Sequence, residues 1–271
     1  MDMILEILRS IFLGLVHGVG EVLPVSGRGH VVIFLRVIGA DPDLVPMILL
    51  SAGFGTMLAL LHHFRTDLAN MVAGTFRYTL KKDFTRKGDT SDLVTVLVAS
   101  VPVIILGLFF RNLFPLDDLL STGFGMLVTG ALLIAVFRMK DIPWKTDVTT
   151  RDSAVFGLFQ VFALFPGLSR VATLLSAGLF QKIDLKKTVR FALLVHLFSF
   201  TPLLLFSISD VNGLPDTASV ISCVTAIITG FIGAKGAAIW MLKSLRVRHL
   251  NALGWYVALL GLFSMILYMT I

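Results

Sequence analysis

Two short polar stretches interrupt the otherwise apolar sequence of this 271-residue chain. The first runs from His17 to His30 and the second from Pro166 to Arg170. Both combine ionisable side chains with glycine and proline, and such groups are costly at membrane depth unless they line a cavity or meet a partner. We therefore interpret the two stretches as parts of a functional site.

The first stretch carries residues for acid–base chemistry. Glu21 follows His17 by one helical turn, so a helix would place both side chains on one face. The pair could be a general base with its orienting group, or a proton relay, with a helix-packing hydrogen bond as the alternative. Ser26 and His30 follow the break and add a candidate nucleophile and a second acid or base for phosphoryl or acyl transfer. For His30 alone, packing in the core is an equally open interpretation.

The second stretch carries an anion-binding arginine. Arg170 cannot shed its charge and can make two parallel hydrogen bonds to a phosphate, so its place after Pro-Gly-x-Ser predicts an oxyanion clamp. Snorkelling toward the membrane surface is the alternative. Gly167 and Ser169 precede it, and Arg28 in the first stretch lies between two glycines that let backbone amides approach an anion. Together the stretches predict a site for an anionic, phosphorylated headgroup whose lipid tail lies in an apolar groove.

Other positions give weaker signals. His196 lies inside an apolar window, and we expect it to pack in the core rather than to line the site. The sequence has no Walker-type phosphate loop, no dinucleotide fingerprint and no HExxH motif, which argues against nucleotide-driven pumping.

The composition excludes a soluble domain with a polar surface, because 56% of the residues are apolar and only 15% are charged. We predict an all-α polytopic membrane protein, since most apolar windows approach the roughly 20 residues that a spanning helix needs. The windows cover residues 3–38, 46–64, 93–110, 119–137, 153–180, 188–208, 218–242 and 250–271. The formal charge of +6 is spread over several loops, so it indicates membrane topology rather than nucleic-acid binding.

The charges of the connecting loops predict which side of the membrane each loop faces. Lysine and arginine concentrate in the loops Arg65–Lys87, Arg138–Arg151, Lys182–Arg190 and Lys243–Arg248. Acids stand in the other connections, at Asp41, Asp43, Asp117, Asp118, Asp210 and Asp216. The positive-inside rule therefore places the basic loops in the cytoplasm and the acidic loops outside.

This assignment predicts two re-entrant hairpins. The window 153–180 has basic loops before and after it, so it enters and leaves on one side, with Pro166 and Gly167 breaking the helix at the tip. The window 3–38 is too long for one span and is broken near Pro24, so we predict a second hairpin with both ends outside.

Each predicted hairpin precedes three predicted spans. The chain would then be a single membrane domain, 1–271, built from inverted repeats at about 3–137 and 153–271. Such an architecture suits alternating-access transporters, and it equally suits an enzyme that needs a lipid headgroup in a dry, polar pocket.

The two polar stretches resemble the motifs of the undecaprenyl-diphosphate phosphatase family, the integral-membrane lipid phosphatases linked to bacitracin resistance. The family's first motif has the form E-G-x-x-E-F-L-P-V-S-S-x-G-H and is matched here at Gly18, Glu21, Leu23, Pro24, Val25, Ser26, Gly29 and His30. Its second motif has the form Q-x-x-A-L-x-P-G-x-S-R-S-G-A-T and is matched at Gln160, Ala163, Leu164, Pro166, Gly167, Ser169 and Arg170. The likeness extends over essentially the full length.

The resemblance implies an enzyme that hydrolyses undecaprenyl diphosphate to the monophosphate and so recycles the lipid carrier of cell-wall glycan synthesis. It implies that Glu21, Ser26 and His30 lie near the scissile phosphate, that Arg170 holds it, and that a divalent cation, Mg²⁺ or Ca²⁺, assists with Glu21 as a candidate ligand. We accordingly expect a multi-pass protein of the plasma membrane whose active site opens toward the extracytoplasmic side. Its partners would be a polyprenyl diphosphate and membrane lipids, with no nucleic acid, and a homodimer is a further expectation.

Both motifs depart from the family pattern. In the first, His17 stands at the family's first glutamate and Gly27 at its second serine, and the next residue is Arg28. In the second, Arg170 is followed by Val-Ala-Thr-Leu rather than Ser-Gly-Ala-Thr. Without the second serine, the nucleophile would be Ser26, His30 or an activated water. Arg28 could neutralise the diphosphate directly, while the loss of a carboxylate at position 17 removes charge that would help to hold a hard cation. A catalytically degenerate homologue that transports a lipid phosphate or another amphiphilic anion is therefore the alternative hypothesis.

Overall fold

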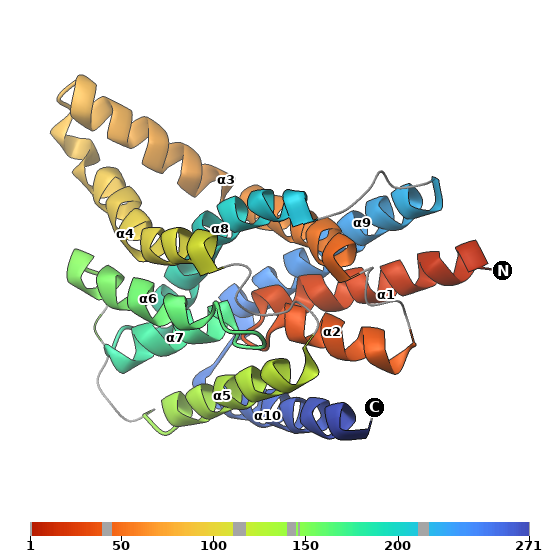
Figure 1. The fold of residues 1–271 in the computed structure, drawn as a ribbon. Coiled ribbons are helices and arrows are strands. Elements are labelled where there is room, and N and C mark those ends of the chain that lie inside the picture. The colour runs from red at the N-terminus through yellow and green to blue at the C-terminus, as the bar shows by residue number, and fades with distance from the viewer. Residues whose placement is uncertain are drawn as a thin grey trace.

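The computed structural model describes residues 2–39, 45–110, 118–139, 145, 147–210 and 217–270. Within these ranges the chain is helical, apart from turns and an isolated β-bridge between Lys145 and Ile183. The elements are α1 (Asp2–Val22), α2 (Gly27–Val37), α3 (Val45–Leu80), η2 (Phe84–Arg86), α4 (Lys87–Phe110), α5 (Leu119–Phe137), α6 (Thr150–Phe162), α7 (Arg170–Phe180), α8 (Leu185–Phe206), η3 (Ser207–Asp210), α9 (Thr217–Ser244) and α10 (Val247–Thr270). Figure 1 shows them as one bundle.

Six of the described helices are long and apolar enough to cross a membrane: α3, α4, α5, α8, α9 and α10. Their outer faces expose large apolar side chains such as Phe109, Phe124, Leu259 and Met269, as contact with lipid requires. The prediction of an all-α polytopic membrane protein is confirmed. The buried core includes α7, which is buried from Val171 to Leu179.

The remaining four α-helices form two helical hairpins, α1 with α2 and α6 with α7. In Figure 1, α1 and α2 enter the bundle at the end where both chain termini lie, whereas α6 and α7 enter at the opposite end, and the two turns meet in the middle. The element order therefore agrees with the predicted order of a hairpin and three long helices, twice. A repeat relationship between 3–137 and 153–271 stays a prediction.

Glycine allows the turn of the second hairpin to sit directly against α5. Gly167 has a positive φ of 76°, which side chains other than glycine rarely adopt. A methyl group at Gly125 of α5 would overlap the carbonyl of Pro166. The Thr129 hydroxyl on the same helix accepts a hydrogen bond from the Ser169 amide at 3.0 Å. The tip that carries Arg170 is thus fixed by close backbone packing.

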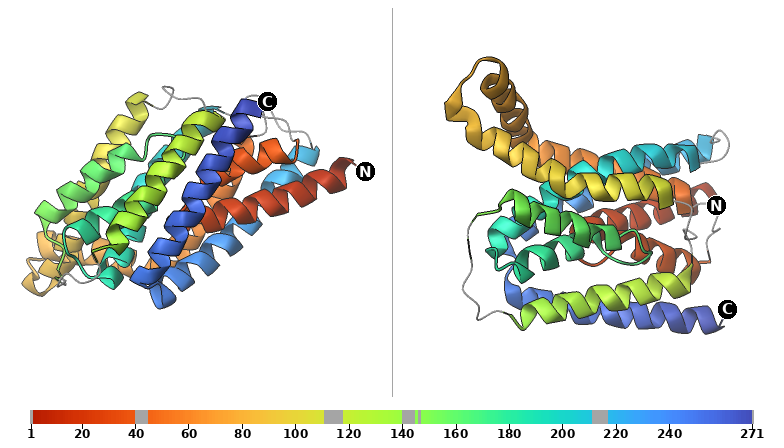
Figure 2. Two further views of the ribbon diagram at one scale, coloured as in Figure 1. Left: turned by 90° about the horizontal axis from the view of Figure 1, so that it is seen from below. Right: turned by 60° about the vertical axis from the view of Figure 1, so that its left-hand side comes forward.

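The prediction that residues 65–87 form a loop is wrong, because most of them are helical. Helix α3 continues to Leu80 and α4 already begins at Lys87, and both ends extend beyond the other helices in Figures 1 and 2. The apolar window ends at residue 64 because polar side chains begin there, but residues 65–80 contain no proline, so the helix continues past the apolar part. The chain turns only at Lys82, which adopts a left-handed φ of 54°.

The structure describes only some of the acidic residues on which the prediction of the outer loops rests. Asp41, Asp43, Asp117 and Asp216 lie outside the described residues. Asp118 caps α5, accepting hydrogen bonds from the amides of Leu120 and Ser121 at 3.4 and 2.8 Å. Partial burial raises the pKa of the Asp118 carboxyl, but its hydrogen bonds with Ser121 and Leu120 outweigh burial and hold the pKa below its usual value.

Candidate active site between the two hairpins

Each hairpin directs the first turn of its second helix toward the centre of the bundle. Ser26 caps α2 in a left-handed conformation, with φ of 69°, and its hydroxyl accepts from the Gly29 amide at 3.3 Å. Ser169 caps α7 from an extended conformation, with φ of −73°, and its hydroxyl accepts from the Ala172 amide at 3.3 Å. The two helix N-termini share the middle of the protein, and such termini favour anions.

Arginine occupies the first turn of both helices, where acidic residues are normally favoured. Arg28 is the second residue of α2 and Arg170 the first residue of α7, and neither first turn contains an acid. A cation beside the positive end of a helix dipole is locally unfavourable. The arrangement therefore requires a negative partner from elsewhere.

Glu21 provides part of that negative charge. Its Oε1 lies 3.1 Å from Nη1 of Arg170, in an ion pair whose side chains are only 10% and 19% exposed. The pair joins the first hairpin to the second across 149 residues of sequence. The structure thus brings the two polar stretches together at one point.

Two buried histidines flank Glu21. His17 lies one turn before it on α1, and His196 of α8 places Nε2 3.9 Å from Oε1 of Glu21. The ring nitrogens of both histidines are buried and have no hydrogen-bond partner. His196 stacks on Phe200 at 5.1 Å, and the Arg170 guanidinium lies 5.2 Å from the centre of the same ring.

His196 is fully buried and lines neither of the two spaces described below, in agreement with the expectation that it packs in the core. The sequence does not show that α8 turns this face toward α1, so the approach of His196 to Glu21 was not predicted. Contact between α1 and α8 depends on how the two hairpins are placed in the bundle.

A cavity of about 100 Å³ opens beside the Glu21–Arg170 pair. Its polar lining is His17, Glu21, Arg28, Arg170 and Ser207, and its apolar lining is Pro46, Leu49, Leu50, Phe200, Leu203 and Leu204. A smaller space of about 30 Å³ adjoins the same charged residues and is lined also by Ser26, Gly167 and Ser169. The cavity thus combines a cationic end with an apolar wall.

His30 does not line either space, although the sequence predicts a catalytic role for it. Its Nδ1 lies 2.8 Å from the Ser26 carbonyl, and its Nε2 lies 2.8 Å from the hydroxyl of Tyr256 on α10. Since a carbonyl only accepts, a neutral ring donates from Nδ1 and accepts the Tyr256 proton at Nε2. His30 therefore stabilises the left-handed turn at Ser26 and links it to Tyr256 of α10.

The residues present do not fit a hard divalent cation. Among the described residues, no group of three or more His, Cys, Asp or Glu side chains is placed to hold a metal ion. Glu21 supplies the carboxylate of the cavity lining, and Arg170 already engages it. Mg²⁺ and Ca²⁺ require several oxygen ligands, which imidazoles do not replace.

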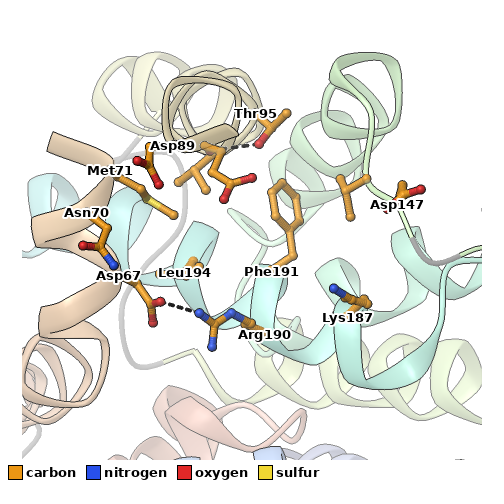
Figure 3. Close-up of a pocket in the computed structure, with 13 residues that line it drawn as sticks. Asp67, Asn70, Met71, Asp89, Thr95, Asp147, Lys187, Arg190, Phe191 and Leu194 are labelled. Atoms are coloured by element: carbon orange, nitrogen blue, oxygen red, sulfur yellow. Dashed lines mark hydrogen bonds and ion pairs between the residues drawn. The ribbon is translucent and has the colours of Figure 1, made fainter. Parts of the chain in front are cut away.

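A larger cavity, of about 300 Å³, lies elsewhere, among α3, α4, α8 and the segment before α6. Figure 3 shows Asp67 paired with Arg190 there, and Asp89, Asp147 and Lys187 also line the cavity. Acids and bases are both present, and none of the residues of the two polar stretches lines it. We place the candidate site between the hairpins, where both stretches meet, despite the smaller volume.

Fold and site together define a polytopic helical membrane protein with an internal pocket that joins two arginines to an apolar wall. Residues 10–263 match the family described as bacitracin resistance protein BacA, and the chain belongs to this family. It is 33% identical to the undecaprenyl-diphosphatase of Acholeplasma laidlawii, with 99% of each chain covered. It is 28% identical to the undecaprenyl-diphosphatase of Thermobifida fusca, covering 95% of this chain and 89% of that protein. The undecaprenyl-diphosphatase of Oceanobacillus iheyensis is 24% identical, with 96% of both chains covered.

Proposed function

We propose that this protein hydrolyses undecaprenyl diphosphate to undecaprenyl monophosphate and phosphate, and so recycles the lipid carrier of cell-wall glycan synthesis. The observation that carries the proposal is the contact between Glu21 and Arg170, which unites both polar stretches beside an apolar wall. Relatives along the whole chain bear the name undecaprenyl-diphosphatase. The transporter alternative is not favoured, since it has no comparable support.

The diphosphate would bind at the two helix N-termini. Arg28 and Arg170 line both the cavity and the adjoining space, and Ser26 and Ser169 line the adjoining space as well. Arginine makes charge-assisted hydrogen bonds to phosphate in parallel pairs. The prenyl chain would lie along the apolar residues of α3 and α8 that line the cavity.

We propose that binding transfers Arg170 from Glu21 to a phosphate oxygen. Glu21 then becomes free to accept a proton from water, while the water oxygen forms a bond to the terminal phosphorus. The bond from that phosphorus to the bridging oxygen breaks, and the lipid monophosphate leaves with the electron pair. Both ring nitrogens of His30 are already engaged and Ser26 caps α2, which favours water as nucleophile over either side chain.

The proposed location is the plasma membrane, with the site open to the extracytoplasmic side. Lys145 and Lys182 lie where α6 and α7 enter the bundle, so the positive-inside rule assigns that end to the cytoplasm. The cavity instead reaches Pro46 at the start of α3 and Ser207 after α8, toward the other end. The homodimer stays a prediction that cross-linking in membranes would test.

Phosphate release from undecaprenyl diphosphate by the purified chain tests the proposal. Wild type should release phosphate, and Arg170→Met should reduce release about 100-fold or more, because charge stabilisation in a buried site is lost. Arg190→Met is the matched control, since Arg190 lies in the other cavity. Absence of release by wild type under every cation condition would refute the function.

A further inference from the structure

Two arginines, Arg28 and Arg170, supply the positive charge of the site, and Arg28 differs from Arg170 in that it makes no ion pair with a described residue. Arg28 lines both the cavity and the adjoining space. It lies near enough to Glu21 and Arg170 for their charges to act on it. No hydrogen bond or ion pair joins it to another described residue. Its guanidinium is therefore available to a ligand.

The resting site has a surplus of positive charge. Arg28 and Arg170 contribute two full charges, the helix N-termini of α2 and α7 add about half a charge each, and Glu21 removes one. The surplus of about two positive charges has no counterion among the described lining residues. Like charges crowded in a poorly hydrated site are costly, so the site is built to be neutralised by a multivalent anion.

Two residues of the first stretch account for this surplus. His17 stands where the motif that the chain resembles has a glutamate, which removes one negative charge when the imidazole is neutral, and Arg28, at a position that the motif leaves open, adds one positive charge. Together they change the site by two charges, which equals the charge of one divalent cation. They also leave Glu21 without a second carboxylate to share such a cation.

We propose that Arg28, together with Arg170, replaces the divalent cation in this protein, so that it hydrolyses its diphosphate substrate without a metal. The inference rests on the proposed function. Arg28 binds the diphosphate and compensates the charge that develops on the leaving phosphate, a task that a metal ion otherwise performs. The pocket then binds the metal-free anion of a prenyl diphosphate and not its metal complex.

Phosphate release from undecaprenyl diphosphate in excess chelator tests this directly, with the full-length protein in detergent. Wild type should keep its rate within about twofold in chelator, and Arg28→Met should lose about tenfold or more there. Arg190→Met should match wild type. Thermal melting checks that each variant is folded. Mass spectrometry of the purified protein should find well under one divalent metal per chain.

A second variant tests whether His17 and Arg28 together determine the independence from metal. His17→Glu combined with Arg28→Ser restores the family's carboxylate and removes the guanidinium, so its activity should depend on added Mg²⁺ or Ca²⁺. Loss of wild-type activity in chelator and recovery with Mg²⁺ would overturn the proposal while leaving the phosphatase function intact. Full activity of Arg28→Met in chelator would overturn it as well. No release by wild type with or without cations would instead refute the function.

Discussion

Breaking the ion pair between Glu21 and Arg170 should destabilise the fold strongly. At 3.1 Å, with side chains 10% and 19% exposed, each group is poorly hydrated and depends on its partner. Removing one partner of a buried pair typically costs about 3–5 kcal/mol, because the other charge stays buried and unpaired. We expect Glu21→Gln and Arg170→Met each to lose stability in this range.

A double-mutant cycle separates this pairing from two independent effects. The variant with both substitutions leaves no unpaired charge at the contact, so its loss should be at least about 2 kcal/mol smaller than the sum of the single losses. Chemical unfolding in detergent micelles measures the free energy of unfolding of wild type, the two single variants and the double variant. The control pair is Asp67 with Arg190, whose side chains are 24% and 51% exposed and should couple by less than about 1 kcal/mol. Coupling below about 0.5 kcal/mol at Glu21 and Arg170 would refute the ion pair.

The same four proteins separate stability from chemistry. Loss of a general base lowers a rate about 10²- to 10⁴-fold, which is about 3–5 kcal/mol of activation free energy. Glu21→Gln should therefore release phosphate far more slowly than wild type. The double variant should regain stability and remain inactive. Recovered activity in the double variant would mean that the pair only supports the fold.

Three further predictions address the elements that hold the site. Tyr256→Phe removes the hydroxyl that bonds to His30, and it should cost about 1 kcal/mol in unfolding assays while phosphate release stays within about threefold. Gly125→Ala should lower the thermal midpoint because a methyl group there meets the Pro166 carbonyl, whereas Gly236→Ala has open space and should raise stability by up to about 1 kcal/mol. Asp152→Ala removes a capping box and should cost about 1 kcal/mol at neutral pH.

The Asp152 effect should also depend on pH. Partial burial raises the pKa of this carboxyl, but hydrogen bonds from Lys145 and Thr149 outweigh burial and hold it below its usual value of 3.8. A group whose pKa is lower in the folded state stabilises the fold above the unfolded-state pKa. This stabilisation is lost as the pH falls through the folded-state pKa. Wild type and variant should therefore converge in acid, and a constant difference down to that range would contradict the role of the charged carboxylate.

Loop charges predicted more of the fold than hydrophobicity alone could. The apolar window at 153–180 is long enough for one span, and only the basic loops on both sides indicate that α6 and α7 form a hairpin. Hydropathy failed at the end of α3, because it measures the apolar part of a helix and not the helix. Propensity and the absence of proline decide where such a helix stops.

The site was predictable in its residue types but not in its contacts. The residue types of the two polar stretches indicated that Glu21 and Arg170 serve one site, and the structure pairs them. The approach of His196 to Glu21 was not predictable, because it depends on the register of α8 against α1, which no local pattern encodes. His30 was expected in the pocket, yet its partner Tyr256 lies 226 residues away on α10. Contacts of this kind are set by the assembly of the whole bundle.

The histidine at position 17 becomes understandable once Arg28 is taken into account. A glutamate there would place a second carboxylate one turn from Glu21, and two neighbouring carboxylates repel each other unless a cation lies between them. A neutral imidazole avoids that repulsion at a site with few ligands for a cation. Its two ring nitrogens are buried without partners, so His17 can also form hydrogen bonds to an incoming phosphate. His17 and Arg28 thus both fit the proposal that the charge of this site is supplied by the chain rather than by a metal ion.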